Sequence, residues 1–233
     1  MLDMEIASKR LGFDVASIEQ GSDYWHKMRL GVITGSRVHC ILSDPRSKQD
    51  KESGKLSDSS MTYMYELVSE IGTGLIPEAI NSKPLLWGKE HESTAREIFE
   101  FETGLTVKEF PFIYKDDSMR VGVSPDGMCS DGRGMEIKAP YTSSQFARFF
   151  VEGVNAVKPE YMAQVQFSMW VSSIDEWYFC NYDCRYKKNN ISYIIIKKDN
   201  FYIDEFERRI PVFIEKMDEV LSLMGESYGN QWR

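Results

Sequence analysis

The chain has 233 residues, of which 42% are hydrophobic and 27% are charged, and its formal net charge is −8. This length is sufficient for a sizeable core, and we expect one domain over residues 1–233. The acidic balance excludes a protein that coats DNA by general attraction, although it allows a local positive groove on an acidic body. No run of residues is long and apolar enough to span a membrane.

The N-terminal segment lacks the charged and then apolar order of a signal peptide, which favours the cytoplasm as the location of the protein. The four cysteines, Cys40, Cys129, Cys180 and Cys184, contain no Cys-x-x-Cys pair. Their spacing favours reduced, structural cysteines over an iron–sulfur cluster.

Apolar periodicity and capping signals predict the order of the elements. Helices are expected at residues 4–11, 23–30, 37–42, 60–72, 85–103, 142–153, 159–173 and 200–224. Strands are expected at residues 105–114, 119–124, 133–139, 176–182 and 191–197, and the first three should form one antiparallel run. The result is an α/β protein whose central sheet is mixed, mostly antiparallel and flanked by helices.

The polar segment 44–59 is long for a loop in a compact domain, which indicates either a function or mobility. It carries Arg46, Lys48, Lys51 and Lys55. These cations can grip a nucleic-acid backbone, or they can belong to a solvated, mobile loop.

Two neighbouring strands place two carboxylates and one amine together. Asp126 follows the strand 119–124, and Glu136 and Lys138 flank Ile137 on the strand after the Asp131-Gly132 turn. Alternation along a strand points Glu136 and Lys138 to one side and Ile137 into the core. Carboxylate oxygens suit Mg²⁺ or Mn²⁺, and a nearby lysine can orient or deprotonate an attacking water. The alternative is a hairpin whose polar face is simply solvated.

Other side chains become candidates if they face this hairpin. Arg29, Thr34 and Ser36 lie around the start of an expected helix, where free N–H groups and the helix dipole attract a phosphate. Otherwise Ser36 caps that helix and Arg29 makes a surface ion pair. Glu92 is either a surface carboxylate or the third carboxylate of a two-metal site. Gln164 lies among apolar residues and must bond either the backbone or a substrate phosphate.

Several longer stretches resemble the phage lambda exonuclease family, a viral recombinase branch of the PD-(D/E)xK nuclease superfamily. These stretches are Gln20-Gly, Trp25-His-Lys-x-Arg29-Leu-Gly-Val-Ile-Thr, Trp87-Gly-Lys, Glu92, Ala95-Arg96, Ser124-Pro-Asp-Gly, Cys129-Ser-Asp-Gly, Tyr161-Met-Ala-Gln-Val-Gln and Phe213-Ile-Glu-Lys-Met-Asp-Glu. They follow the family order almost from end to end. The resemblance implies a restriction-endonuclease-like core.

The resemblance also implies an activity and its metal site. Members of the family are Mg²⁺-dependent, ATP-independent exonucleases that digest the 5′-ended strand of linear duplex DNA to 5′-mononucleotides and leave 3′ single-stranded tails. By position, Asp126, Glu136 and the Ile137 carbonyl would hold one Mg²⁺, and Glu92 and Asp126 would hold a second. Mn²⁺ can substitute for Mg²⁺, and Lys138 would position the attacking water.

The contacts with DNA implied by the resemblance come from several parts of the chain. A pocket for the 5′-phosphate would consist of Arg29, Ser36, Ser124 and Gln164. Arg46 would reach the minor groove, Leu85 would separate the terminal base pair, and Thr34 would contact DNA. Ser144 occupies the position at which the family has an arginine that contacts DNA. This difference leaves open how the protein binds the downstream part of the duplex.

Family members work as homotrimeric rings that enclose DNA duplex ends, preferably 5′-phosphorylated, and a phage single-strand annealing protein takes up the product strand. Two other functions compete with this prediction. One is a related metal-dependent endonuclease. The other is a non-enzymatic module that binds or anneals single strands, for which a basic groove with stacking aromatics is not evident.

Overall fold

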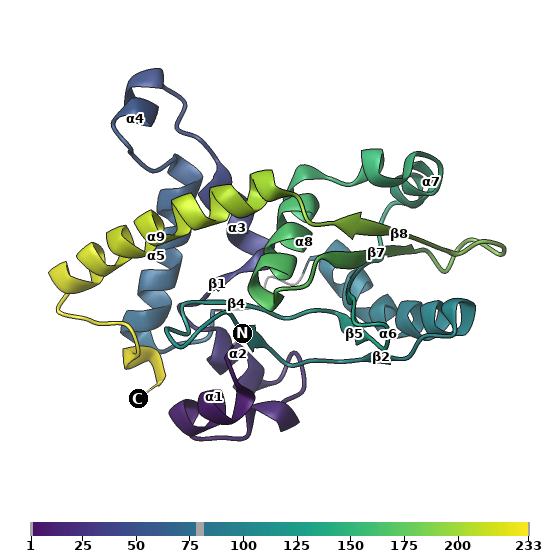
Figure 1. Ribbon diagram of the computed structural model, residues 1–233, viewed down its shortest axis with the longest axis horizontal. Helices are drawn as coiled ribbons and strands as arrows, with labels where there is room; N and C mark the ends of the chain where they lie inside the picture. Colours follow the sequence, from purple (N-terminus) through teal and green to yellow (C-terminus); the bar gives the residue numbers. More distant parts are fainter. Residues whose placement is uncertain (1, 78–81, 233) are drawn as a thin grey trace.

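The computed structural model describes residues 2–77 and 82–232, in which helices surround two mixed sheets (Figure 1). One sheet has the strand order β1-β4-β3, and the other has the order β2-β5-β6-β7-β8. The pairs β1–β4 and β6–β7 are parallel, whereas β2–β5, β3–β4, β5–β6 and β7–β8 are antiparallel. The prediction of an α/β protein with mixed, mostly antiparallel strands is confirmed, but the strands are divided between two sheets.

The α-helices are α1 (Met4–Leu11), α2 (Asp23–Arg29), α3 (Val38–Leu42), α4 (Lys48–Glu52), α5 (Asp58–Thr73), α6 (Lys83–Thr103), α7 (Ser143–Glu152), α8 (Pro159–Ser172) and α9 (Asn200–Leu223). The strands are β1 (Ile33–Thr34), β2 (Val107–Lys108), β3 (Ile113–Tyr114), β4 (Val121–Val123), β5 (Gly127–Cys129), β6 (Gly134–Lys138), β7 (Glu176–Tyr182) and β8 (Ile191–Lys197). Short 3₁₀ turns occur at Val15–Ser17, Gly35–Arg37, Gly153–Ala156 and Asn230–Trp232. No helix in the part that the structure describes is long and apolar enough to cross a membrane.

The helix α6 begins and ends at residues suited to those positions. The Ser82 hydroxyl accepts a hydrogen bond from the Leu85 N–H, and Pro84 occupies the first turn, where its missing N–H costs nothing. Gly104 ends the helix with a φ of 72°, a left-handed conformation that glycine adopts without strain. These two ends fix the position of the first half of α6, which carries Glu92.

The five-stranded sheet is covered on both faces. Ala95 and Phe99 of α6 pack against Met135 and Ile137 of β6 on one face. On the other face, α7 and α8 pack against β7. These two helices also form the crossover that a parallel β6–β7 pair requires. Because Ile137 faces α6, the alternating residues Glu136 and Lys138 face the side of α8, as strand geometry predicts.

The expected antiparallel run over residues 105–139 is wrong in detail. The segment 105–114 contains two short strands, β2 and β3, which belong to different sheets, and Pro111 between them cannot donate a ladder hydrogen bond. The strand β4 pairs with β1 and β3, and the antiparallel partner of β6 is instead β5, which starts after Pro125. The chain therefore changes sheets at residues 124–126.

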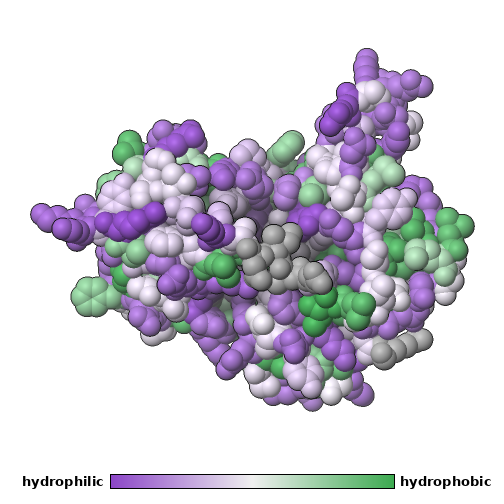
Figure 2. Space-filling view, turned by 180° about the vertical axis from the view of Figure 1, so that it is seen from behind, coloured by the Kyte–Doolittle hydropathy of each residue, from purple (hydrophilic) through white to green (hydrophobic). Residues whose placement is uncertain are grey.

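The polar segment 44–59 is not a plain loop, because it contains the short helix α4, whose N-cap Ser47 accepts a hydrogen bond from the Asp50 N–H. Asp44 pairs with Lys51 and with Arg209 of α9, which ties the base of this segment to the body. The segment projects from the body beside α5 and α9 (Figure 1) and carries a hydrophilic surface (Figure 2).

A substitution at Gly134 tests the packing of the five-stranded sheet. A Cβ at this position would overlap the ring of the fully buried Trp177, so Gly134→Ala should lower the free energy of unfolding by about 2–3 kcal/mol. Gly72→Ala is the control, because a Cβ there would meet only the Glu226 side chain at 3.8 Å. Denaturant unfolding checks the prediction, and equal stabilities of the two variants would contradict it.

Candidate active site

One cavity of about 940 Å³ lies where the first half of α6, the end of β6 and α8 meet residues 124–126. These three residues connect β4 of one sheet to β5 of the other and are called the joint between the two sheets. The cavity is lined by all the proposed site residues except Arg46, namely Arg29, Thr34, Ser36, Leu85, Glu92, Ser124, Asp126, Glu136, Ile137, Lys138 and Gln164. Residues up to 135 positions apart in sequence therefore share one cavity.

Asp126 lies in the joint between β4 and β5. Its backbone N–H donates to the Met135 carbonyl at 3.1 Å, and its side-chain Oδ2 accepts a 2.6 Å hydrogen bond from the Ile137 N–H. The carboxylate is therefore fixed against β6, directly beside Glu136. This is the arrangement that the Asp126 and Glu136-x-Lys138 spacing predicts.

Glu136 is only 2% exposed, so a solvated polar hairpin face is excluded. Its Oε1 accepts hydrogen bonds from Lys138 Nζ at 2.5 Å and from Gln164 Nε2 at 2.7 Å. Lys138 Nζ also donates to Gln164 Oε1 at 3.3 Å and lies 4.6 Å from the centre of the Tyr161 ring. Gln164 therefore satisfies its amide on the hairpin, and not on the backbone.

The carboxylates of the cavity repel one another. Burial and the negative charges of Glu136 and Glu92 raise the pKa of Asp126 well above its ordinary value, and burial also raises the pKa of Glu92. Burial works to lower the pKa of Lys138, but the charges of Glu136 and Asp126 outweigh it and raise this pKa. In the metal-free protein Lys138 is therefore an ammonium group at neutral pH, which can donate hydrogen bonds.

Glu92 is not a plain surface residue, because its side chain is 35% exposed and lines the cavity. Its Oε1 accepts a 3.0 Å hydrogen bond from Arg96, one turn further along α6. Among residues 2–77 and 82–232, no three His, Cys, Asp or Glu side chains converge as a ready cation cage. The candidate carboxylates instead accept hydrogen bonds from protein donors.

Arg29 forms the second charged part of the cavity. Its Nη1 donates to the Ser124 hydroxyl at 2.9 Å, and its guanidinium lies 4.1 Å from the centre of the Trp25 ring. Burial lowers the pKa of Arg29 to about 10, so the side chain stays charged at neutral pH. No carboxylate in the part of the chain that the structure describes pairs with it. The alternative of a surface ion pair is therefore wrong.

The expected cap at Ser36 is also wrong. A 3₁₀ turn, Gly35–Arg37, precedes α3, and the N-cap of α3 is Arg37, which makes no side-chain capping bond. Ser36 is exposed and Thr34 is 7% exposed, and both line the cavity. Their position in the lining of the cavity thus comes from the packing of this turn against α8 and not from a helix N-terminus.

The two remaining DNA-contact candidates lie in different parts of the molecule. Leu85 is 45% exposed in the first turn of α6, at the edge of the cavity. Arg46 is exposed at the start of the projecting segment 44–59 and does not line the cavity. The structure thus separates Arg46 from the other candidates.

Two residues around the site carry no role in the sequence interpretation. Trp25 covers Arg29 from one turn earlier in α2, and its Nε1 donates to the Ser124 hydroxyl at 3.1 Å. Arg96 contacts both Glu92 and the Asp126 carbonyl. The spacing of four residues in Trp25…Arg29 and Glu92…Arg96 indicates both same-helix contacts, because such pairs share one helix face.

Residues 24–175 match the model of the YqaJ-like viral recombinase domain, and this range contains the described site. The chain belongs to this family. A protein of Escherichia coli (strain K12) called ExoD is 48% identical over 86 residues, which cover 99% of that protein and 37% of this chain. The predicted resemblance to viral recombinases is confirmed.

Two solved structures are similar over most of this YqaJ-like protein. LHK-Exo in complex with dAMP, an alkaline exonuclease from Laribacter hongkongensis, is 27% identical with a TM-score of 0.74, covering 87% of this chain and 96% of LHK-Exo. A phage-related exonuclease from Haemophilus somnus 129PT is 21% identical with a TM-score of 0.67, covering 83% of this chain and 96% of that one, and supports the fold alone. The restriction-endonuclease-like architecture is confirmed.

Proposed function

We propose that this protein is a Mg²⁺-dependent, ATP-independent 5′→3′ exonuclease of linear double-stranded DNA. It digests the 5′-ended strand to 5′-mononucleotides and leaves 3′ single-stranded tails for recombination by annealing. One observation carries the proposal, namely that the Asp126, Glu136 and Lys138 cluster shares a cavity with the guanidinium of Arg29, which pairs with no carboxylate among the described residues. The LHK-Exo structure, solved with a mononucleotide, supports the same product class.

The donor set fits divalent cations. Asp126 and Glu136 lie together with Glu92 nearby, and burial and mutual repulsion raise the pKa of Asp126, so added positive charge would stabilise the ionised cluster. Oxygen donors of this kind suit Mg²⁺, and Mn²⁺ can replace it. Asp126, Glu136 and the Ile137 carbonyl would hold one ion, and Glu92 and Asp126 a second. When bound, the ions neutralise charge on the attacking and leaving oxygens.

Lys138 is the residue that would hold the attacking water. Its ammonium is fixed by Glu136 and Gln164, so its position does not depend on the flexible lysine stem. As an ammonium group it would orient the water by donating a hydrogen bond, and it would stabilise negative charge that develops on the phosphate. Gln164, on α8, forms a hydrogen bond with each of Lys138 and Glu136 and so fixes the two side chains relative to each other.

Arg29 and Ser124 would bind the 5′-terminal phosphate. A guanidinium forms charge-assisted hydrogen bonds with phosphate oxygens, and partial burial strengthens these bonds. Ser36 and Gln164 complete the proposed pocket. Thr34, Leu85 and Arg46 would contact the duplex around it, with Leu85 at the terminal base pair and Arg46 in the minor groove.

The proposed partners follow from the same function. The substrate is a linear duplex end, preferably 5′-phosphorylated, and the enzyme works as a homotrimeric ring around DNA in the cytoplasm of a bacterial host. A ring retains DNA by topology, so an acidic body is compatible with processive digestion. The 3′-tailed product would pass to a phage single-strand annealing protein.

A time course of digestion tests the proposal. The substrate is a linear duplex labelled separately at each 5′ and 3′ end, with Mg²⁺ and without ATP. Early release of the 5′ labels as mononucleotides is expected, whereas early loss of the 3′ labels would contradict the polarity. A closed circular duplex should stay intact, and its linearisation would favour the endonuclease alternative.

Replacing Arg29 by alanine should reduce the preference for 5′-phosphate over 5′-hydroxyl ends. A hydrogen bond to a charged group contributes about 1.5–3 kcal/mol, so the ratio of the two digestion rates should fall roughly tenfold or more. Arg37→Ala is the control, because Arg37 lies outside the cavity and pairs with Glu66. An unchanged ratio in paired assays of Arg29→Ala would refute the phosphate pocket.

A further inference from the structure

Arg96 joins two of the candidate metal ligands. Its Nη2 donates to Glu92 Oε1 at 3.0 Å, its Nε donates to the Asp126 carbonyl at 3.2 Å, and its Nη1 pairs with Glu109. The side chain is only 12% exposed. One planar guanidinium thus contacts an α6 carboxylate, the joint between the two sheets and the segment between β2 and β3.

These contacts differ from those of an ordinary helix ion pair. An exposed pair four residues apart contributes about 0.3–0.5 kcal/mol and fixes little. Here the same guanidinium also holds the main chain at a residue 30 positions away, in a joint that belongs to neither adjoining strand. The orientation of Glu92 and the position of Asp126 are therefore set by one rigid group.

We infer that Arg96 is a positioning residue that sets the separation of Glu92 and Asp126 for divalent-ion binding. The inference rests on the proposed function and extends it to a residue that is not itself one of the proposed metal ligands. With one oxygen of Glu92 held by Arg96, the other oxygen is left for the cavity. Lysine keeps the charge of Arg96, but its single nitrogen cannot reproduce a planar three-way contact.

Charge and position predict opposite effects at this residue. If Arg96 acted only as a nearby positive charge, then Arg96→Gln would remove a repulsion and strengthen cation binding. If it positions the ligands, then both Arg96→Lys and Arg96→Gln should weaken cation binding by about 10–100-fold, the usual effect of losing a group that orients a metal ligand.

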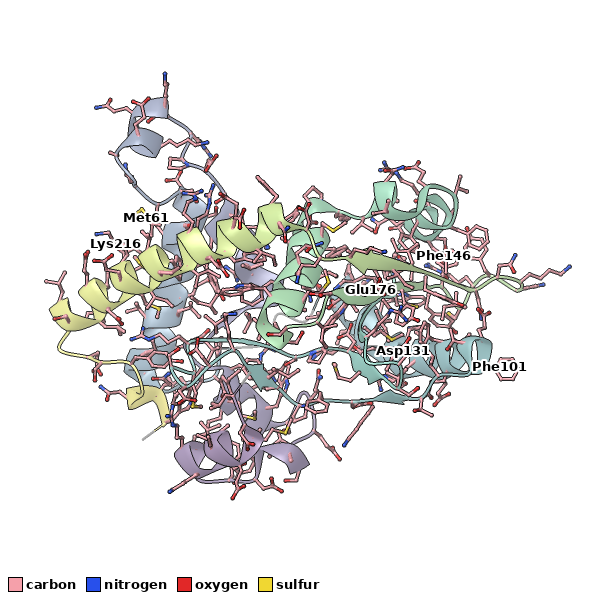
Figure 3. The ribbon with its side chains drawn as sticks, viewed as in Figure 1. Met61, Phe101, Asp131, Phe146, Glu176 and Lys216 are labelled. Carbon is pink, nitrogen blue, oxygen red and sulfur yellow. The ribbon has the colours of Figure 1, made fainter. Side chains whose placement is uncertain are left out.

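The experiment titrates the full-length protein with Mn²⁺ in the absence of DNA and measures free Mn²⁺ by electron paramagnetic resonance. Arg133→Lys is the matched control, because Arg133 also pairs with two carboxylates, Asp131 and Glu176 (both labelled in Figure 3), and neither of them lines the cavity. We expect the control to bind Mn²⁺ as the wild type does. Circular dichroism establishes that each variant is folded, and either Arg96 variant that folds is sufficient for the test.

Kinetics provide the second readout. For Arg96→Lys, the Mg²⁺ concentration for half-maximal digestion should rise at least tenfold, while KM for DNA ends changes little. Unchanged Mn²⁺ binding, or tighter binding by Arg96→Gln, would overturn the inference and leave the proposed function intact. A wild-type protein that binds Mn²⁺ but does not digest DNA would overturn the function alone, and one that binds no Mn²⁺ would overturn both.

Discussion

Replacing Lys138 by alanine is expected to reduce single-turnover digestion by about 10²–10³-fold, the usual cost of removing one preorganised hydrogen-bond donor from an active site. Binding to duplex ends should persist, because Arg29 and Ser124 are unaffected. The physical reason is that the ammonium of Lys138 is held 2.5 Å from Glu136 and faces the cavity. Without it, the water beside this carboxylate would lose its charged donor, and only the amide of Gln164 would remain there.

Lys158→Ala is the matched control for Lys138→Ala. Lys158 lines the same cavity and lies 5.3 Å from the centre of the same Tyr161 ring, but its carboxylate neighbour is Glu160 on the surface. The measurements are hydrolysis of a 5′-phosphorylated duplex at saturating enzyme and a mobility-shift assay of end binding. Digestion by Lys138→Ala at nearly the wild-type rate would remove the catalytic assignment.

Replacing Asp126 by asparagine should abolish digestion and, at the same time, raise the melting temperature of the metal-free protein. Asparagine has the same shape and keeps an acceptor for the Ile137 N–H, but it removes a charge that repels Glu136 and Glu92. We expect the free energy of unfolding of the metal-free protein to increase by about 1 kcal/mol, which is within the usual range for a single stabilising substitution. Mg²⁺ should then stabilise the wild type more than the variant, since only an intact site binds the ion tightly.

Asp183→Asn provides a control of the opposite sign. Asp183 is fully buried, and its carboxylate accepts hydrogen bonds from Arg185. Burial alone would raise the pKa of Asp183, but the hydrogen bonds from Arg185 outweigh burial, so the pKa is lowered. Removing its charge should therefore lower the melting temperature. Thermal denaturation with EDTA and with Mg²⁺ measures both variants, and a less stable Asp126→Asn protein without metal would show that repulsion does not dominate the site.

The accuracy of the sequence predictions depends on the length of each element. The strands β7 and β8 agree with the expected residues 176–182 and 191–197, because each is a seven-residue run rich in aromatic or β-branched residues beside a polar turn. The strands β1 to β5 have only two or three residues, too few to show a period. Their division between two sheets depends on tertiary packing, and the capping signals that placed α6 have no equivalent there.

The same limit applies to the candidate site. Spacing along one hairpin was sufficient to place Asp126 beside Glu136 and Lys138. The arrival of Arg29 and Gln164 in the same cavity depends on α2 and α8, and only the family resemblance predicted it. The prediction that Ser36 caps a helix is wrong, because a 3₁₀ turn replaces the expected first turn of α3. The contact of Arg96 with the Asp126 carbonyl joins residues 30 positions apart, which no local pattern reveals.

The joint between the sheets has a consequence for the size of the product. Ser124 and Asp126 are separated by a single proline, so their Cα atoms can lie no more than about 7 Å apart. On the proposed function, one of these residues grips the terminal phosphate and the other serves the bond to be cut. The backbone between them would then act as a molecular ruler that measures one nucleotide, and inserting a residue there would change the length of the fragment released.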